Sequence, residues 1–459
     1  MRFYDRKQEI EVLKKRLTSP KFELIYLLWR RRIGKTELIQ HLNTEILHTD
    51  FLYLFVEKSD LSAFLRRQER NFYRHFGIKY RFETVEDFLE AFFNQSSVQI
   101  LIIDEFQNFE AIDKSIFSTF QHMVDKYHKK STKKIVVLWS IQSMMIKIFE
   151  HAKEPLYKRA TQPMIIKAFD LDTQIEILQD LFGDHYSHKI LLDTYTIFGG
   201  VPYYLKSLRE EGYTQYDLAQ LLKDLFFSDF APLQNEGKEI LIEEFGQRYR
   251  RFFAILEAVA RGKNRHNEIV SELGIWEKGE VNVYLRDLVQ IYEMIEVVSP
   301  ILETKTTITK YKIKDNFLNF WFRYIYAHKE LFELGSYEVL LQGVLTDFPS
   351  FQGLAFERLV KDRILLKNKK GELEFPITKM GTRLDRRNNE IDLVYTDEKE
   401  HIVFVECKLS GKRITSAERN QLQHNVGLFF DKNPALQYKN IQLCFAIFDE
   451  KNLVRFEEV

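Results

Sequence analysis

The 459-residue sequence has little cysteine, no excess of either charge and no long apolar run. It contains two cysteines, Cys407 and Cys444, and no CxxC pair, which excludes a disulfide-stapled scaffold and a cysteine-bound zinc site. Its 67 basic and 67 acidic side chains cancel, so bulk charge favours neither a nucleic-acid partner nor a membrane surface. No apolar segment approaches the roughly 20 residues that span a bilayer, and the charged start is unlike a signal peptide. We therefore expect a soluble, cytoplasmic protein with several domains.

Residues 29–36 read Trp-Arg-Arg-Arg-Ile-Gly-Lys-Thr and follow the phosphate-loop pattern GxxxxGK[ST], with Trp29 in the place of the first glycine. The apolar residues 22–28 in front predict a strand, and residues 36–47 behind predict a helix. In this context Gly34 lets the backbone approach a phosphate, Lys35 reaches the β- and γ-phosphates, and the Thr36 hydroxyl binds Mg²⁺. The predicted nucleotide-binding stretch is Trp29, Arg30, Arg31, Arg32, Ile33, Gly34, Lys35 and Thr36.

Two later strands supply further candidate residues. Apolar residues 98–103 predict a strand that ends in Asp104 and Glu105, the Walker B pattern, in which the aspartate binds Mg²⁺ and the glutamate orients water. The alternative is a plain acidic turn, which the phosphate loop upstream disfavours. Residues 134–138 predict another strand, and Ser140 behind it is a candidate γ-phosphate sensor or a solvated strand-end serine.

Two positions farther along the chain are candidate nucleotide contacts. Arg159, in the segment PLYKRA, is a candidate arginine finger, with an unpartnered surface arginine as the alternative. Residues 199–202, Gly-Gly-Val-Pro, interrupt two helical segments. Either a lid contacts the adenine there through Pro202, or the four residues form only a helix-terminating turn.

These segments occur together in one family. The chain resembles, over essentially its whole length, the archaeal-type ATPases of the signal-transducing (STAND-like) P-loop NTPases, which are relatives of the AAA proteins. The resemblance rests on the segments FYDRKQEIEVL, RRRIGKTELI, LIIDEFQN, SIQSMM, PLYKRA and GGVPYYL. The resemblance implies an ATP-binding core followed by a helical lid, with ATP and Mg²⁺ as cofactors. The chain departs from the family at Trp29 and Trp139, where glycine is usual. We expect both indoles side by side at the nucleotide pocket, stacking on the ligand or, the favoured outcome, impairing ATP binding.

The middle of the chain predicts two helical regions of different kinds. Residues 171–240 read as helices of a lid or bundle. Helical segments at 251–260, 267–273 and 279–289, then strands at 291–298 and 307–313, indicate a winged helix. Its third helix carries Glu280, Arg286 and Asp287, which suit DNA poorly, whereas the basic cluster at 261–266 suits the phosphate backbone. Packing on the ATPase core is an equal alternative, and the aromatic stripe at 316–322 is expected to be core.

The C-terminal segment predicts a carboxylate site. A helix that begins at Gly353 carries Glu357, a strand at 389–395 carries Asp392, and a strand at 401–407 leads into Glu406-Cys407-Lys408. This set resembles the PD-(D/E)xK nuclease core, the usual partner of this ATPase family.

That second resemblance implies roles for these residues. Asp392 and Glu406 are catalytic residues that bind Mg²⁺, Glu357 completes the metal site, and Lys408 orients the attacking water. Glu390 is a substitute ligand, and Cys407 is expected in the core. The alternative is a retained fold whose acidic residues form surface ion pairs. The cations expected to hold the phosphate backbone are Arg383, Arg386, Arg387, Lys412 and Arg413.

Together these observations predict an α/β protein built of five segments. They are a P-loop NTPase core (1–170), a helical lid (171–240), a winged helix (241–325), a helical linker (326–349) and a restriction-endonuclease-like domain (350–459). We expect an ATPase that regulates or powers a Mg²⁺-dependent nuclease-like domain acting on DNA. A degenerate ATPase that serves as a scaffold or regulator is the alternative, and an ATP-independent nuclease is a third. ATP and DNA are expected partners, a membrane is not, and a homo-oligomer stays open.

Overall fold

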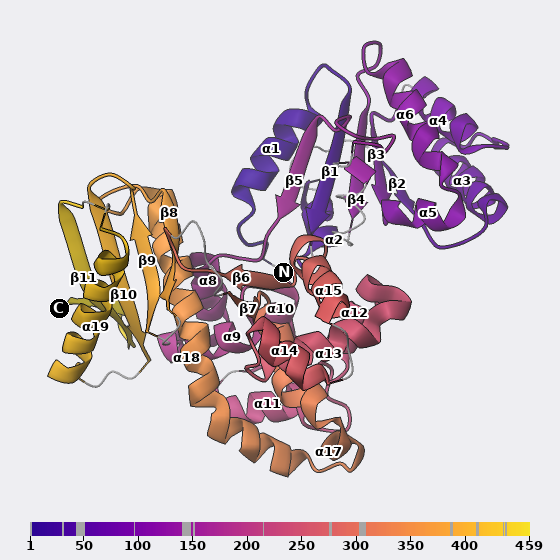
Figure 1. Ribbon diagram of the computed structural model, residues 1–459. Coiled ribbons are helices and arrows are strands. Elements are labelled where there is room, and N and C mark those ends of the chain that lie inside the picture. Colours follow the sequence, from indigo (N-terminus) through magenta and orange to yellow (C-terminus); the bar gives the residue numbers. More distant parts are fainter. Residues whose placement is uncertain are drawn as a thin grey trace. The chain divides into compact units, whose positions relative to one another are not determined.

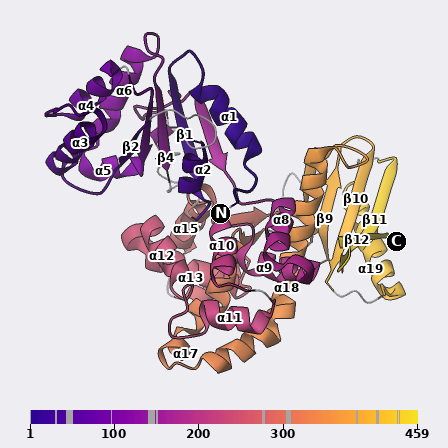
Figure 2. The same cartoon turned by 180° about the vertical axis from the view of Figure 1, so that it is seen from behind.

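The computed structural model divides the chain into two compact units, Met1–Ala168 and Phe169–Val459, and each is described by itself (Figures 1 and 2). The structure describes residues 2–29, 32–42, 51–95, 97–139, 148–149, 152–213, 215–274, 278–302, 309–385, 389–409, 413–434, 436 and 438–459. In this part of the chain, no helix combines the length and the apolar character that crossing a membrane requires.

A five-stranded parallel sheet forms the centre of the first unit, in the order β2-β3-β4-β1-β5 (Figure 1). Its strands are β1 (Glu23–Trp29), β2 (Phe51–Phe55), β3 (Ile100–Asp104), β4 (Lys134–Trp139) and β5 (Gln162–Ile166). Every residue of β3 is buried, as expected for a parallel strand covered on both faces. Since β4 pairs with β1 on one side and β3 on the other, the carboxyl ends of these strands meet at one edge. Ligands bind at this edge in open α/β sheets.

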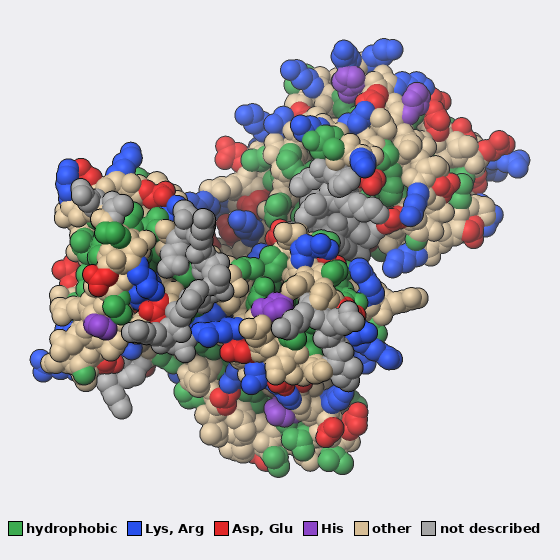
Figure 3. All heavy atoms as spheres, viewed as in Figure 1, with side chains coloured by type: hydrophobic (Ala, Val, Ile, Leu, Met, Phe, Trp, Pro, Cys, Tyr) green, Lys and Arg blue, Asp and Glu red, His purple; other side chains and the backbone are tan. Residues whose placement is uncertain are grey.

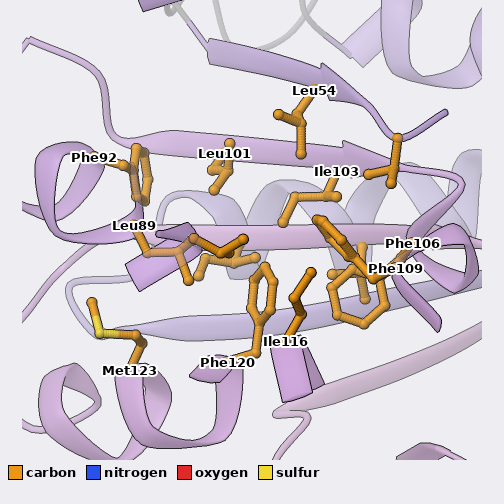
Figure 4. Close-up of a cluster of buried hydrophobic side chains, with 14 of the residues drawn as sticks. Leu54, Leu89, Phe92, Leu101, Ile103, Phe106, Phe109, Ile116, Phe120 and Met123 are labelled. Carbon is orange, nitrogen blue, oxygen red and sulfur yellow. The ribbon is translucent and has the colours of Figure 1, made fainter. Parts of the chain in front are cut away.

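Helices cover the sheet and build an aromatic core. They are α1 (Lys7–Leu17), α2 (Lys35–His41), α3 (Leu61–Phe76), α4 (Val85–Asn94), α5 (Phe109–Ile112) and α6 (Ser115–Tyr127). Residues of α3, α4 and α6 share one buried cluster with Leu101 and Ile103 of β3. Phe106, Phe109 and Phe120 contact one another within it (Figure 4). This packing holds the carboxyl end of β3 in a fixed position.

The second unit begins with helices and a β-hairpin. Its first helices are α8 (Leu171–Phe182), α9 (His188–Phe198), α10 (Pro202–Glu210), α11 (Leu218–Phe226) and α12 (Glu236–Phe245). They are followed by α13 (Tyr249–Ala260), α14 (His266–Leu273), α15 (Lys278–Gln290), β6 (Ile295–Val298) and β7 (Lys310–Ile313). The strands β6 and β7 pair antiparallel. β6 begins later than the expected residue 291, because α15 continues to Gln290 and Glu293 has a positive φ of 48°.

A long helix leads into the C-terminal sheet. The remaining helices before the sheet are α16 (Asn316–Phe320), α17 (Lys329–Glu333) and α18 (Tyr337–Lys370). The aromatic stripe around α16 is core, as predicted, because Phe317, Phe320 and Phe322 are fully buried. The expected helix start at Gly353 is wrong: α18 begins at Tyr337 and continues through Pro349. Burial of Phe348 and Phe351 beside the proline offsets the lost backbone hydrogen bond.

The C-terminal sheet has five strands in the order β12-β11-β10-β9-β8, with β10 and β11 parallel and the other neighbours antiparallel. The elements are β8 (Lys379–Leu384), β9 (Glu390–Thr396), β10 (His401–Lys408), α19 (Ser416–Lys432), β11 (Asn440–Asp449) and β12 (Leu453–Glu458). α19 packs on a face that includes Phe404 and Phe445. Phe356 of α18 contacts Phe448, which strand alternation places on the opposite face. The sheet therefore lies between α18 and α19.

Candidate functional site

The first candidate site lies where β1 turns into α2. Gly34 is the residue before α2 and has a φ of 86°, a left-handed conformation that favours glycine. Its place between a buried strand and a helix is the local context that the phosphate-loop motif requires. Ile33 beside it is buried and anchors the loop in the core.

Lys35 joins the loop to the end of β3. Its Nζ bonds to Asp104 Oδ1 and lies 2.8 Å from Glu105 Oε1, although Lys35 and Asp104 are 69 residues apart in sequence. Asp104 is almost fully buried, and Lys35 is largely buried as well. Three of the predicted site residues thus meet in one group of two carboxylates and one ammonium.

Two residues of this site were missed by sequence reasoning. The Tyr53 hydroxyl on β2 donates to Asp104 Oδ2 at 2.5 Å, and burial together with this carboxylate raises the pKa of Tyr53. Arg6, in the N-terminal segment FYDRKQEIEVL, is 4% exposed and donates to the Ile33 carbonyl at 3.4 Å and the Lys167 carbonyl at 2.7 Å. Arg6 lies in a segment that carries the family resemblance, which could have pointed to it, whereas Tyr53 had no such signal.

The expectation that Trp139 lies beside Trp29 at the nucleotide pocket is not supported. Its indole is fully buried in the core and contacts Phe106 and Phe149. Strand alternation explains this placement, because Trp139 continues the row of buried side chains formed by Ile135 and Val137. The side chains of Trp29 and Thr36 lie outside the described residues, as do Arg30, Arg31 and Ser140.

Arg159 forms an ion pair, and Pro202 lies at the start of a helix. The Nε and Nη2 atoms of Arg159 each lie 3.0 Å from an oxygen of the Asp125 carboxylate. Arg159 is therefore not the unpartnered arginine of the alternative interpretation. Pro202 is the first residue of α10, and Gly199 ends α9 with a φ of 58°. Residues 199–202 therefore form a helix-terminating turn, and the finger and adenine roles stay predictions.

The second candidate site gathers carboxylates from three elements. Glu357 comes from α18, Asp392 from β9, and Glu406 with Lys408 from β10. Asp392 Oδ2 accepts a hydrogen bond from the Cys407 backbone N–H at 2.7 Å, which ties β9 to β10. Lys408 Nζ lies 3.4 Å from Glu406 Oε1 and 3.8 Å from Glu418.

Charge crowding at this site is strong. Burial raises the pKa of Asp392 to about 8, and the charges of Glu357, Glu406 and Glu390 add to the rise. Burial also raises the pKa of Glu406, against the effect of Lys408. The four predicted carboxylates, Glu390 included, therefore share one electrostatic environment. Cys407 was expected to be fully buried, but it is half-buried. Burial raises the pKa of its thiol.

The carboxylates are chemically suited to Mg²⁺, which prefers oxygen ligands. Among the described residues, however, no three Asp, Glu, His or Cys side chains are positioned to hold one metal ion together. Glu357 lies 3.1 Å from Lys312 Nζ, and Glu390 lies 2.5 Å from Lys310 Nζ. In the arrangement described, lysines balance the charge of these two side chains.

A cavity of about 330 Å³ opens beside the carboxylates. The charged side chains that line it are four basic ones, Lys312, Lys314, Arg358 and Lys361, and four acidic ones, Glu296, Glu357, Asp362 and Asp392. The expectation that Arg383 holds phosphate is wrong, because it is 3% exposed and lies 3.8 Å from Asp385. Arg413 is exposed, and Arg386, Arg387 and Lys412 lie outside the described residues.

The basic cluster at 261–266 is engaged within the second unit. Arg261 donates to the Ala327 carbonyl at 3.2 Å and lies 3.3 Å from Glu257, while His266 lies 2.5 Å from the Asn282 amide oxygen. Of the charged residues on α15, Glu280 pairs with Arg251, and Arg286 pairs with Asp287. Basic and acidic side chains are interspersed over the face shown in Figure 3. These contacts favour internal packing of this region.

The fold and the first site define a class of protein. Residues 3–208 match the family model described as "ATPase domain predominantly from Archaea". Residues 321–422, which contain Glu357, Asp392, Glu406 and Lys408, match a model described as "Archaea bacterial proteins of unknown function". The chain thus contains an archaeal-type ATPase domain, followed by a C-terminal region of that second kind.

A curated relative shows the family. The uncharacterized protein MJECL04 of Methanocaldococcus jannaschii is 32% identical over 408 residues, which cover 88% of this chain and 87% of the relative. The chain therefore belongs to the family of that protein.

Solved structures show lower similarity. The Walker-type ATPase PABY2304 of Pyrococcus abyssi is 20% identical, with a TM-score of 0.49, over 70% of this chain and 96% of its own. The ORC2 protein of Aeropyrum pernix is 13% identical, with a TM-score of 0.48, over 74% of this chain and 95% of its own.

The raised pKa of Asp392 predicts a pH-dependent loss of stability. The folded state holds this proton more tightly than the unfolded state, so its contribution is complete below the ordinary pKa of 3.8 and is lost as the pH rises toward about 8. Replacing Asp392→Asn removes the titration. The unfolding temperature of the variant is expected to fall less than that of the native chain between these pH values.

The matched control is Glu398→Gln, which changes an exposed carboxyl paired with Lys379 on the same sheet. This variant is expected to keep the native pH profile. Parallel profiles for the native chain and Asp392→Asn contradict the prediction.

Proposed function

We propose that this chain is an ATP-binding ATPase whose nucleotide state regulates a metal-dependent, nuclease-like carboxylate site that acts on DNA. Two observations support the two halves of the proposal. Lys35 meets Asp104 and Glu105 at the edge of a parallel sheet. Glu357 and Asp392 line a cavity, and Glu406, whose charge acts on Asp392, lies beside the strand-end Lys408.

In the ATPase half, each residue has a task that follows from its charge and place. Gly34 and the loop backbone approach the phosphates, and Lys35 moves from Asp104 and Glu105 to the β- and γ-phosphates. Asp104 and Thr36 would hold the Mg²⁺ that accompanies the nucleotide, and this ion would neutralise phosphate charge. Glu105 then orients the attacking water, and Tyr53 keeps the Asp104 carboxylate in place through its hydroxyl. Arg6 supports the loop through the Ile33 carbonyl.

Titration of ATP and Mg²⁺ into the full chain tests this half. Lys35→Ala is expected to weaken ATP binding at least about tenfold and to abolish hydrolysis, because a charge-assisted bond to phosphate is lost. Lys58→Ala, which changes an exposed lysine of the same unit, is expected to bind as the native chain does. Trp29→Gly is expected to bind more tightly, since glycine restores backbone freedom at the loop.

Absence of ATP binding in both the native chain and Trp29→Gly contradicts the ATPase half. That result favours the degenerate ATPase that acts as a scaffold or regulator.

In the nuclease-like half, Asp392, Glu406 and Glu357 hold the metal, with Glu390 as a substitute ligand. A bound metal would supply a water of lowered pKa, which is the chemistry that phosphodiester hydrolysis needs. Lys408 would orient this water, and Lys361 at the cavity would contact a DNA phosphate.

The domain division of the proposal follows the predicted segments. The core is 1–170, the helical lid 171–240, the winged helix 241–325, the linker 326–349 and the nuclease-like domain 350–459. The helix order α13, α14, α15 and the β6–β7 hairpin support the winged helix. Contacts of Arg261 and His266 with neighbouring groups of the same unit favour a regulatory over a DNA-reading role.

A cleavage assay on single- and double-stranded DNA, with and without ATP, tests the nuclease-like half. Cleavage is expected to require Mg²⁺ and to stop when the metal is chelated. Asp392→Asn is expected to lower the rate at least about a hundredfold, because the metal supplies several kcal/mol of stabilisation.

Glu398→Gln serves as the control and is expected to cleave at the native rate. Equal rates with and without ATP favour an ATP-independent nuclease. Equal rates for Asp392→Asn and the native chain contradict the carboxylate site.

A further inference from the structure

Two lysines of the β6–β7 hairpin reach the carboxylate site. Alternation along β7 places Lys310 and Lys312 on one face of the strand and Tyr311 and Ile313 on the other. Lys310 Nζ is 2.5 Å from Glu390 Oε2, at a separation of 80 residues. Lys312 Nζ is 3.1 Å from Glu357 Oε2, at a separation of 45 residues. Both lysines are largely covered, with side chains 15% and 28% exposed.

The hairpin is held in this place from two sides. On the α18 side, Arg358 donates to the Lys314 carbonyl at 2.8 Å and the Ile313 carbonyl at 2.7 Å, at the end of β7. On the sheet side, the Ile301 N–H donates to the Thr382 carbonyl at 2.8 Å, and Pro300 forms a parallel bridge with Thr382 of β8. Ile301 is itself buried in the core cluster of the C-terminal sheet. The lysines are thus presented by an anchored element.

Lys310 and Lys312 contact carboxylates that are predicted to bind a metal ion. Glu357 is a predicted metal ligand, and Glu390 is the predicted substitute. A carboxylate removed from water needs a positive partner, and an ammonium group and a divalent cation compete for the same oxygens. Among the described residues, no group of three Asp, Glu, His or Cys side chains is arranged to hold a metal ion.

We propose that the β6–β7 hairpin closes the carboxylate site by placing Lys310 and Lys312 on the side chains that bind the metal. Hairpin contact and metal binding then exclude each other, and release of the hairpin opens the site. This inference rests on the proposed metal-dependent function of Asp392 and its neighbours. It adds the regulation: the hairpin of the predicted winged helix acts on the nuclease-like site within the same unit.

Calorimetric titration of Mn²⁺ into the full chain tests the proposal. The double variant Lys310→Met and Lys312→Met keeps the length of both side chains and removes both charges. It is expected to bind Mn²⁺ at least about tenfold more tightly than the native chain, because two charge-assisted competitors are gone. Adding Asp392→Asn to the double variant is expected to cancel the gain.

Lys314→Met is the matched control. Lys314 belongs to the same hairpin and lines the same cavity, but its Nζ lies 3.7 Å from Glu293, outside the carboxylate site. This variant is expected to bind Mn²⁺ within about twofold of the native affinity. A second measurement uses the native chain alone: saturating Mn²⁺ is expected to speed hydrogen exchange of the hairpin amides.

The results separate this inference from the function on which it rests. If the native chain binds Mn²⁺ through Asp392 and the double variant binds no more tightly, the closing role of the hairpin is overturned and the metal site stands. Unchanged hairpin exchange with Mn²⁺ bound overturns the closing role in the same way. If neither chain shows binding that depends on Asp392, the proposed metal site fails, and the closing role fails with it.

Discussion

A carboxylate that leaves water requires a cation or a proton, and both candidate sites are built around this constraint. At the first site, Lys35 balances Asp104 and Glu105 at the edge of the parallel sheet. At the second, lysines from β7 and β10 stand beside Glu390, Glu357 and Glu406, while Asp392 keeps its proton to higher pH. In the proposed closing role, a metal ion would take the places of Lys310 and Lys312 at their carboxylates.

The same constraint explains how distant segments are joined in the second unit. The hairpin supplies charge to the C-terminal sheet, and α18 returns the contact through Arg358 on the hairpin carbonyls. A hydrophobic anchor at Ile301 adds to these polar contacts. Under the proposed closing role, metal binding and hairpin contact would form one linked equilibrium.

Local patterns predicted much of this arrangement. The strand, loop and helix around Gly34, and the acidic pair at the end of β3, follow from apolar runs that stop at charged residues. The strands that carry Asp392 and Glu406 were predicted in the same way. Long-range packing was not: Lys310 and Lys312 look like solvated strand residues in sequence, and their role depends on contacts across 80 and 45 residues. Arg383 was misjudged because its burial beside Asp385 leaves no local signal, and α18 continues through Pro349 because aromatic packing outweighs the proline.

The central claim is that lysine and metal compete for the same carboxylates. Anomalous diffraction from crystals of the full chain grown with Mn²⁺ tests it most directly. The account predicts manganese beside Asp392 and Glu357, with Lys312 Nζ moved away from Glu357. Manganese bound at Asp392 while Lys312 still contacts Glu357 would contradict the account.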